Sequence, residues 1–255
     1  YWDESVRYVF RRAEIEDDIE KAAAELHALC LDLVDDVVRS ERAMRRLRLP
    51  EHAFDLIAQS WKRRDPSLYG RFDLVYDGRS APRLLEYNAD TPTSLYEAAV
   101  VQWRWLEQLI ASGALPPHAD QFTSLHEKLI ARFGQILKPG FLHLACMRDA
   151  ADDAGTLAYL SDCALQAGFD TGLVDMAHIG LRGETFVDGT GRRIARLFKL
   201  YPWEWMFADA FGRSPAMART QFIEPPWKLI LSNKGALTLL WEKAPHHPNL
   251  LECYF

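Results

Sequence analysis

The first part of the chain carries apolar residues at every third or fourth position, with charged residues between them. The clearest run consists of Ala22, Leu26, Leu29, Leu33 and Val37. This spacing puts the apolar side chains on one face of a helix, so it predicts a long amphipathic helix that Pro50 interrupts. A second helix is predicted over 51–61, and Pro66 and Gly70 then end the helical pattern.

Residues 71–92, RFDLVYDGRSAPRLLEYNADTP, follow the strand pattern instead. They predict two short strands joined by a turn rich in Gly, Ser and Pro. The next helix is predicted from Ser94 to about Ser112, with Thr91 or Thr93 as its N-cap. The predicted strand pair therefore lies between two helical regions.

The second half of the chain alternates between helical and strand patterns. Helices are predicted over 118–137 and 154–167, strands over 141–147, 171–176 and 195–200, and a hairpin near 188–193. Because strand, helix and strand follow one another, we predict a fold of the α/β (α+β) class.

Polar side chains on the strand pair 71–92 are the first candidate chemistry. Residues two apart in a strand share a face, so Glu86 and Asn88 point the same way. If the two strands pair antiparallel, Arg71 and Asp73 can join them. Two carboxylates and an amide are hard oxygen ligands that suit Mg²⁺ better than Zn²⁺. The alternative is a solvent-facing strand with exposed ion pairs, and spacing alone favours it.

Two lysines in largely apolar settings are the second candidate. Lys199 lies on the predicted strand 195–200, and Lys234 opens a predicted helix. Lys199 is either a strand-end residue whose ammonium reaches solvent or a buried cation that needs an anionic partner. Lys234 lies at the unfavourable, positive end of a helix dipole, which favours a nearby anion.

Charge and composition restrict the partners and the location. The 255 residues carry a net charge of −6 and are 49% hydrophobic, and no run of five like charges occurs. Nucleic acid and anionic membranes are therefore excluded as expected partners. No apolar stretch approaches the roughly 20 residues of a membrane span and no signal segment opens the chain, so we expect a cytoplasmic protein.

The segment LLEYNADTPTSLYEA, residues 84–98, resembles the signature of the glutathionylspermidine synthase family. Other segments resemble the same family in the same order, namely 1–27, 152–169, 198–206 and 224–251. The resemblance implies an ATP-grasp ligase with a pre-ATP-grasp layer. Residues 1–255 then form one synthetase-like region, with a helical part over 1–70, a pre-ATP-grasp and substrate part over 71–180, and the start of the nucleotide-binding part over 181–255.

The resemblance also implies roles for individual residues. The family's Mg²⁺ ligands match Asp73, Glu86 and Asn88. The two lysines that bind the ATP phosphates in this family match Lys199 and Lys234. The family's catalytic arginine, which lies beside the transferred phosphate and contacts the acyl-donor substrate, matches Arg71. Further positions that line the substrate pocket match Thr91, Thr93, Asp152 and Asp153. From sequence alone, the two aspartates could equally be helix-capping acids.

The activity implied by the resemblance is ATP-dependent joining of a carboxylate, free or on a peptide, to an amine, which a polyamine would fit. We expect a synthetase-only member, which lacks the amidase domain of the bifunctional members. The sequence begins with Tyr1 and not with Met, and residues 250–255 contain no residue typical of a helix or strand end. We therefore expect missing residues at both ends, including a C-terminal lid needed for full activity. The alternative is a non-catalytic nucleotide- or peptide-binding module derived from an ATP-grasp domain.

Overall fold

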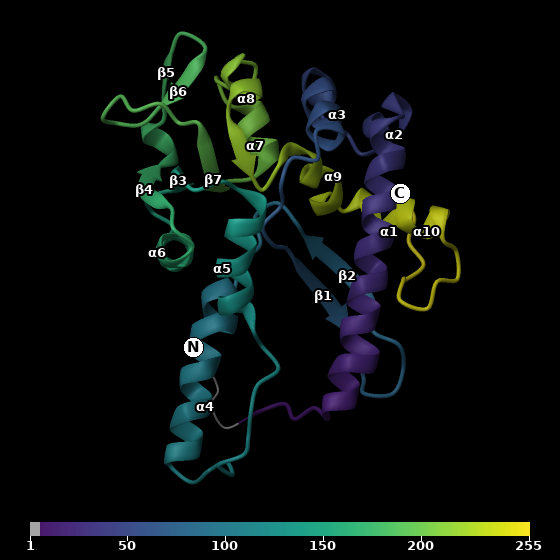
Figure 1. Ribbon diagram of the computed structural model, residues 1–255. Coiled ribbons are helices and arrows are strands. Elements are labelled where there is room, and N and C mark those ends of the chain that lie inside the picture. The colour runs from purple at the N-terminus through teal and green to yellow at the C-terminus, as the bar shows by residue number, and fades with distance from the viewer. Residues whose placement is uncertain (1–5) are drawn as a thin grey trace.

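A parallel sheet forms the centre of the computed structural model, which describes residues 6–255 (Figure 1). Its strands follow the order β4-β3-β7-β8, with β3 at Phe141–Cys146, β4 at Asp170–Asp175, β7 at Arg196–Leu200 and β8 at Gln221–Ile223. Each neighbouring pair in this order is parallel. The parallel sheet with its helices confirms the predicted α/β class.

Helices cover both faces of the sheet. Leu142 and Phe198 point toward α5 and α6 on one face, whereas Ala145 and Leu197 point into the core formed with α1, α3 and the C-terminal helices on the other. Neighbouring strand residues such as Leu197 and Phe198 enter different cores because side chains alternate across a sheet. The helices are α1 Lys21–Val38, α2 Glu41–Arg46, α3 Phe54–Lys62, α4 Gln102–Ala111, α5 Leu125–Ile136, α6 Ala151–Gln166, α7 Trp203–Ala208, α8 Ala216–Arg219, α9 Leu229–Ser232 and α10 Gly235–Lys243.

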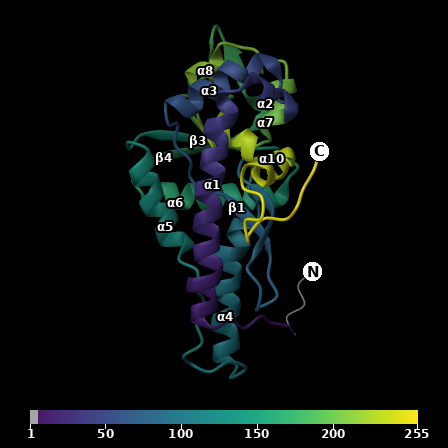
Figure 2. The ribbon, with the colours of Figure 1, turned by 90° about the vertical axis from the view of Figure 1, so that its right-hand side faces the viewer.

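The predicted strand pair is a separate antiparallel hairpin of β1, Arg71–Val75, and β2, Arg83–Asn88. Figures 1 and 2 both place it beside α1, and the Tyr87 hydroxyl lies 3.1 Å from Nδ1 of His27 on that helix. Leu84 and Tyr87 are buried in the same core as α1. The hairpin is thus anchored on its apolar side, which leaves its polar side free for chemistry.

Several predicted boundaries are wrong for local reasons. The first helix ends at Val38, well before Pro50, because Ser40 takes an extended conformation and its hydroxyl accepts a hydrogen bond from the backbone N–H of Ala43, at 3.2 Å, as the cap of α2. A π-helical turn precedes α4 without a side-chain cap, so neither predicted threonine caps that helix. The hairpin predicted near 188–193 is confirmed, because Val187 pairs antiparallel with Arg193 and the backbone N–H of Asp188 donates to the carbonyl oxygen of Arg192 at 2.9 Å. A hairpin that was not predicted pairs β5, Gly180–Arg182, with β6, Thr185–Val187. None of the helices within residues 6–255 is long and apolar enough to cross a membrane.

Replacing Gly70 by Ala is expected to cost about 1–3 kcal/mol of stability through overpacking. An added Cβ would lie 2.7 Å from Cε2 of Tyr87, whose ring is buried and packs against Phe72 at 4.1 Å between centroids. Gly134→Ala is the control, because nothing lies within 4 Å of that exposed helical position, and it should stabilise by about 0.5–1 kcal/mol. Chemical denaturation measures both, and equal stabilities of the two variants would contradict the prediction.

Candidate active site

The hairpin brings the polar residues 71–88 together as predicted. Across the two strands Arg71 faces Asn88 and Asp73 faces Glu86. Directly opposed residues in an antiparallel pair have side chains on the same face, with Cβ atoms about 5 Å apart. The Asp73 side chain is 40% exposed and that of Glu86 is 27% exposed, so both carboxylates can be reached by a ligand. The predicted pairing and the shared face are therefore confirmed.

Arg71 connects the hairpin to the loop that follows it. Its Nε and Nη2 atoms donate to the two carboxylate oxygens of Asp73, at 2.7 and 3.1 Å. Its Nη1 donates to the hydroxyl of Thr93 at 2.8 Å and to the carbonyl oxygen of the same residue at 3.1 Å. Because a guanidinium donates in a fixed plane, this double contact sets the orientation of all three side chains.

Lys234 meets the hairpin from the start of α10. Its ammonium forms an ion pair with the Glu86 carboxylate, although the two residues are 148 positions apart in the chain. This carboxylate is the anion that a lysine at a helix N-terminus requires. The Lys234 side chain is 71% exposed, so its ammonium stays accessible to a second anion.

Lys199 has a different setting from Lys234. It is fully buried and pairs with Asp90, and its ammonium also lies 4.5 Å from the centre of the Trp203 ring. The interpretation of Lys199 as a strand-end residue reaching solvent is wrong, because its partner is internal. Burial lowers the pKa of Lys199, and the neighbouring Asp90 carboxylate opposes that shift. The two lysines therefore have separate carboxylate partners in this structure.

Asp90 is the residue that sequence reasoning missed. It lies two positions after β2, is 2% exposed, and accepts a 2.7 Å hydrogen bond from the backbone N–H of Trp203 besides binding Lys199. The backbone N–H groups of Ala89 and Asp90 donate to the hydroxyl of Ser232, at 3.1 and 2.8 Å. An aspartate just after a strand is typical of a turn, so no sequence pattern indicated that Asp90 is buried and pairs with Lys199.

A cleft of about 510 Å³ opens beside the loop that follows β2. Thr91 and Thr93 line it together with Asp153 from the first turn of α6, so three of the five predicted substrate residues share one cavity, whereas Arg71 lies outside its lining. Asp152 is exposed and is not part of the lining. Burial raises the pKa of Asp153, and the adjacent Asp152 carboxylate adds to the shift.

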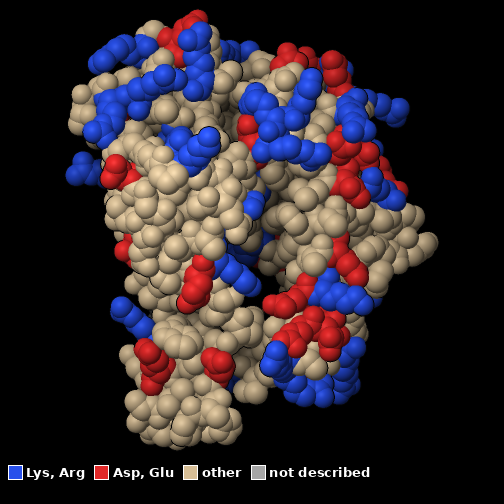
Figure 3. Space-filling view, in the orientation of Figure 1, with Lys and Arg blue, Asp and Glu red and all other residues tan. Residues whose placement is uncertain are grey.

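The same cleft has a lining that the sequence did not indicate. Asp149 contributes a further carboxylate, and Tyr201 and Trp205 contribute aromatic rings. The two rings meet edge to face, with 5.5 Å between centroids. Figure 3 shows both acidic and basic side chains around the hollow on one face of the molecule. The cleft can thus present negative charge and aromatic surface to one ligand.

The donor set of the hairpin fits a magnesium ion in its chemistry. Asp73, Glu86 and Asn88 offer only oxygen ligands, which this ion prefers. The two carboxylates already bind the cations Arg71 and Lys234, yet each carboxylate can accept several partners. Within residues 6–255, no three His, Cys, Asp or Glu side chains lie close enough together to hold a metal ion, so this set would rely on the Asn88 amide as its third ligand.

The fold and the site together describe an α/β domain whose hairpin presents paired acids and a lysine beside an acidic cleft. A family described as Glutathionylspermidine synthase preATP-grasp matches residues 1–255. The chain belongs to this family, which confirms the resemblance seen in segment 84–98.

Individual relatives match at different levels. A provisionally named acid–amine ligase of Haemophilus influenzae is 45% identical over 100% of this chain and 65% of its own length. The bifunctional glutathionylspermidine synthetase/amidase of Escherichia coli is 27% identical over 94% of this chain and 42% of its own length. A trypanothione synthetase of Crithidia fasciculata is 24% identical over 91% of this chain and 39% of its own length. The chain thus spans about two thirds or less of these curated relatives.

Proposed function

We propose that the protein is an ATP-dependent ligase that joins a carboxylate to an amine. The observation that carries this proposal is the convergence of Arg71, Asp73, Glu86 and Lys234 on one side of the hairpin. The names of the relatives, an acid–amine ligase and two synthetases, support the same reaction class. The proposal assigns this activity to the complete protein that carries the chain.

The proposed reaction has two steps. First, a carboxylate oxygen attacks the γ-phosphorus of ATP, the bond from that phosphorus to the bridging oxygen breaks, and ADP leaves with that oxygen. The product is an acyl phosphate. The amine nitrogen then attacks the acyl carbon, the carbon–oxygen bond to phosphate breaks, and the nitrogen loses a proton to solvent. Negative charge on the transferred group must be stabilised in the first step.

The basic residues provide that stabilisation in this proposal. Arg71 is proposed to contact the transferred phosphate and the acyl donor, and its position between Asp73 and Thr93 supports that role. Lys234 is accessible to an ATP phosphate. Lys199 could bind a phosphate only after it separates from Asp90, since the pair is buried. We therefore propose that Lys234 binds phosphate directly and that Lys199 requires a rearrangement to do so.

Magnesium is the proposed cofactor, held by Asp73, Glu86 and Asn88. When bound, it would neutralise phosphate charge and orient ATP. The protein's contribution is to hold two carboxylates opposite each other on one face of two adjacent strands. Arg71 keeps the Asp73 carboxylate in a fixed orientation through two hydrogen bonds.

The cleft supports a division between the two substrates. Thr91, Thr93 and Arg71 lie beside the hairpin and suit the acyl donor, a small carboxylate or a peptide. Asp153 and the neighbouring Asp152 offer carboxylates for the amine. A cationic amine such as a polyamine also gains from Trp205, because aromatic faces attract cations. The amine is thus proposed to enter from the side of α6.

Formation of ADP is expected only when ATP, Mg²⁺, a carboxylate and an amine are all present, because the acyl phosphate must be consumed for turnover to continue. The test screens amino acids and peptides against polyamines with the complete gene product, and it detects ADP together with the mass of the amide. ATP hydrolysis that ignores the amine would contradict the ligase. Nucleotide binding without any turnover would favour the alternative, a binding module that lacks catalysis.

A further inference from the structure

Glu224 and Lys228 form a buried ion pair that the proposed reaction does not use. Glu224 follows β8 and Lys228 lies at the start of α9, and their side chains are 0% and 1% exposed with 2.7 Å between Oε2 and Nζ. Removing two charges from water is costly, and such a pair often stabilises no more than apolar residues of the same volume would. The role of the pair is therefore to be found in the backbone groups that the two side chains bind.

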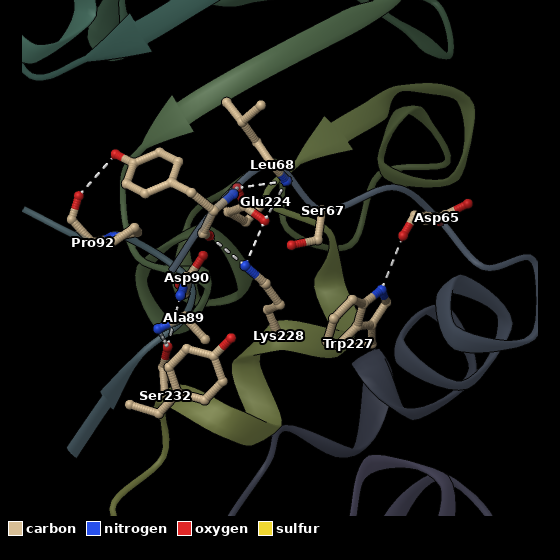
Figure 4. A network of polar contacts seen from close by, with 12 residues as sticks. Asp65, Ser67, Leu68, Ala89, Asp90, Pro92, Glu224, Trp227, Lys228 and Ser232 are labelled. Atoms are coloured by element: carbon tan, nitrogen blue, oxygen red, sulfur yellow. Dashed lines mark hydrogen bonds and ion pairs between the residues drawn. The ribbon is translucent and has the colours of Figure 1, made fainter. Parts of the chain in front are cut away.

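The pair holds the backbone that leads into β1 (Figure 4). The Glu224 carboxylate accepts hydrogen bonds from the N–H groups of Leu68 and Tyr69, both at 3.0 Å, and Lys228 donates to the Tyr69 carbonyl oxygen at 2.5 Å. Residues 65–70 have no regular secondary structure. The two side chains thus satisfy backbone groups that a sheet or helix would otherwise pair.

Tyr69 carries this contact on to the loop after β2. Its hydroxyl donates to the carbonyl oxygen of Pro92 at 3.0 Å, and its ring stacks on Phe198 of β7 with 6.3 Å between centroids. Pro92 lies between Thr91 and Thr93, the two threonines that line the cleft. The chain before Arg71 and the loop that carries these threonines are therefore fixed relative to each other through one residue.

We propose that Glu224 and Lys228 are positioning residues that place Arg71 and the threonine loop relative to the parallel sheet. The proposal rests on the proposed ligase function for its catalytic consequence. A displacement of about 1 Å in a site that depends on orientation can reduce the rate about 100-fold. Neither residue lines the cleft, so both would act through the backbone of residues 68–70.

The test compares three variants of the complete protein. Lys228→Met leaves the Glu224 carboxylate buried without its cation and is expected to unfold most easily. The double variant Glu224→Gln with Lys228→Met removes both charges while it keeps similar volumes, so it is expected to fold. The control is the double variant Asp36→Asn with Lys243→Met, which removes a more exposed pair between α1 and α10.

Amide hydrogen exchange is the readout that does not depend on ligase activity. In the Glu224→Gln and Lys228→Met double variant, we expect the amides of residues 66–75 to exchange at least tenfold faster than in the wild type, while those of β3 keep the wild-type rate. In the control variant, residues 66–75 should also keep the wild-type rate. We also expect a 10- to 100-fold lower kcat with a smaller change in KM for ATP.

Each outcome decides between the two proposals. Unchanged exchange of residues 66–75 would overturn the positioning role, whether or not the wild-type protein is a ligase. Faster exchange with an unchanged kcat would also overturn it, because the backbone contact would then not matter for the site. Faster exchange in a protein whose wild type joins no acid to any amine would reject the ligase function and retain the structural half of the inference.

Discussion

Replacing Glu86 by Gln is expected to lower kcat of the proposed ligase about 100- to 1,000-fold, the usual cost of removing one group that stabilises transition-state charge. Gln keeps the size of the side chain but removes the negative charge that faces Asp73 and pairs with Lys234. Both the proposed binding of Mg²⁺ and the orientation of Lys234 depend on that charge. The measurement is steady-state ADP formation over a range of Mg²⁺ concentrations, where the variant should need more metal for half-maximal rate.

The control for this variant is Glu242→Gln in α10, the helix that directly follows Lys234. Glu242 pairs with Arg46 at the surface, at 2.7 and 2.5 Å. Surface pairs contribute at most about 1 kcal/mol, so this variant should keep wild-type kcat and dependence on Mg²⁺. A Glu86→Gln protein that matches the control in both measurements would remove Glu86 from the site.

Replacing Trp203 by Ala is expected to lower the free energy of unfolding by about 3–5 kcal/mol, the usual loss for a buried large aromatic side chain. Trp203 is 0% exposed and packs on Phe207 and Phe222 with ring centroids 5.2 and 5.0 Å apart. Its Nε1 donates to the Glu224 carbonyl oxygen at 3.2 Å. The truncation leaves a cavity and an unpaired carbonyl group, and chemical denaturation measures the loss.

Trp205→Ala is the matched comparison two residues away. The Trp205 side chain is 57% exposed and lines the cleft, so its loss should change stability by no more than about 1 kcal/mol. Its effect should appear in KM for the amine, because the ring is proposed to contact that substrate. Equal destabilisation by the two substitutions would contradict the assignment of Trp203 to the core and of Trp205 to the cleft.

Local patterns in the sequence determined most of the elements near the site. The alternation in 71–92 was enough to predict the hairpin and the shared face of Glu86 and Asn88, because the period of two in a strand is fixed by backbone geometry. The apolar runs at β3 and β7 likewise indicated buried strands. Boundaries were predicted less well, since a single residue such as Ser40 can end one helix and cap the next.

The tertiary structure decided which partners the charged residues meet. Sequence indicated an anion beside Lys234 and left open whether Lys199 has one. It could not name Glu86 and Asp90, which lie 148 and 109 positions away in the chain. Such pairs depend on how β2, β7 and α10 pack against one another, and no local sequence pattern shows which distant residues come into contact.

The buried pair of Glu224 and Lys228 shows the same limit most clearly. Residues four apart at the end of a strand and the start of a helix read as ordinary surface charges. Only the packed chain shows that they are buried and that they bind the backbone of Leu68 and Tyr69. The sequence by itself thus determined the family, the hairpin and its oxygen donors, because these follow from local spacing and motif. Burial and long-range pairing came from the tertiary structure, because both depend on segments that the chain brings together only when it folds.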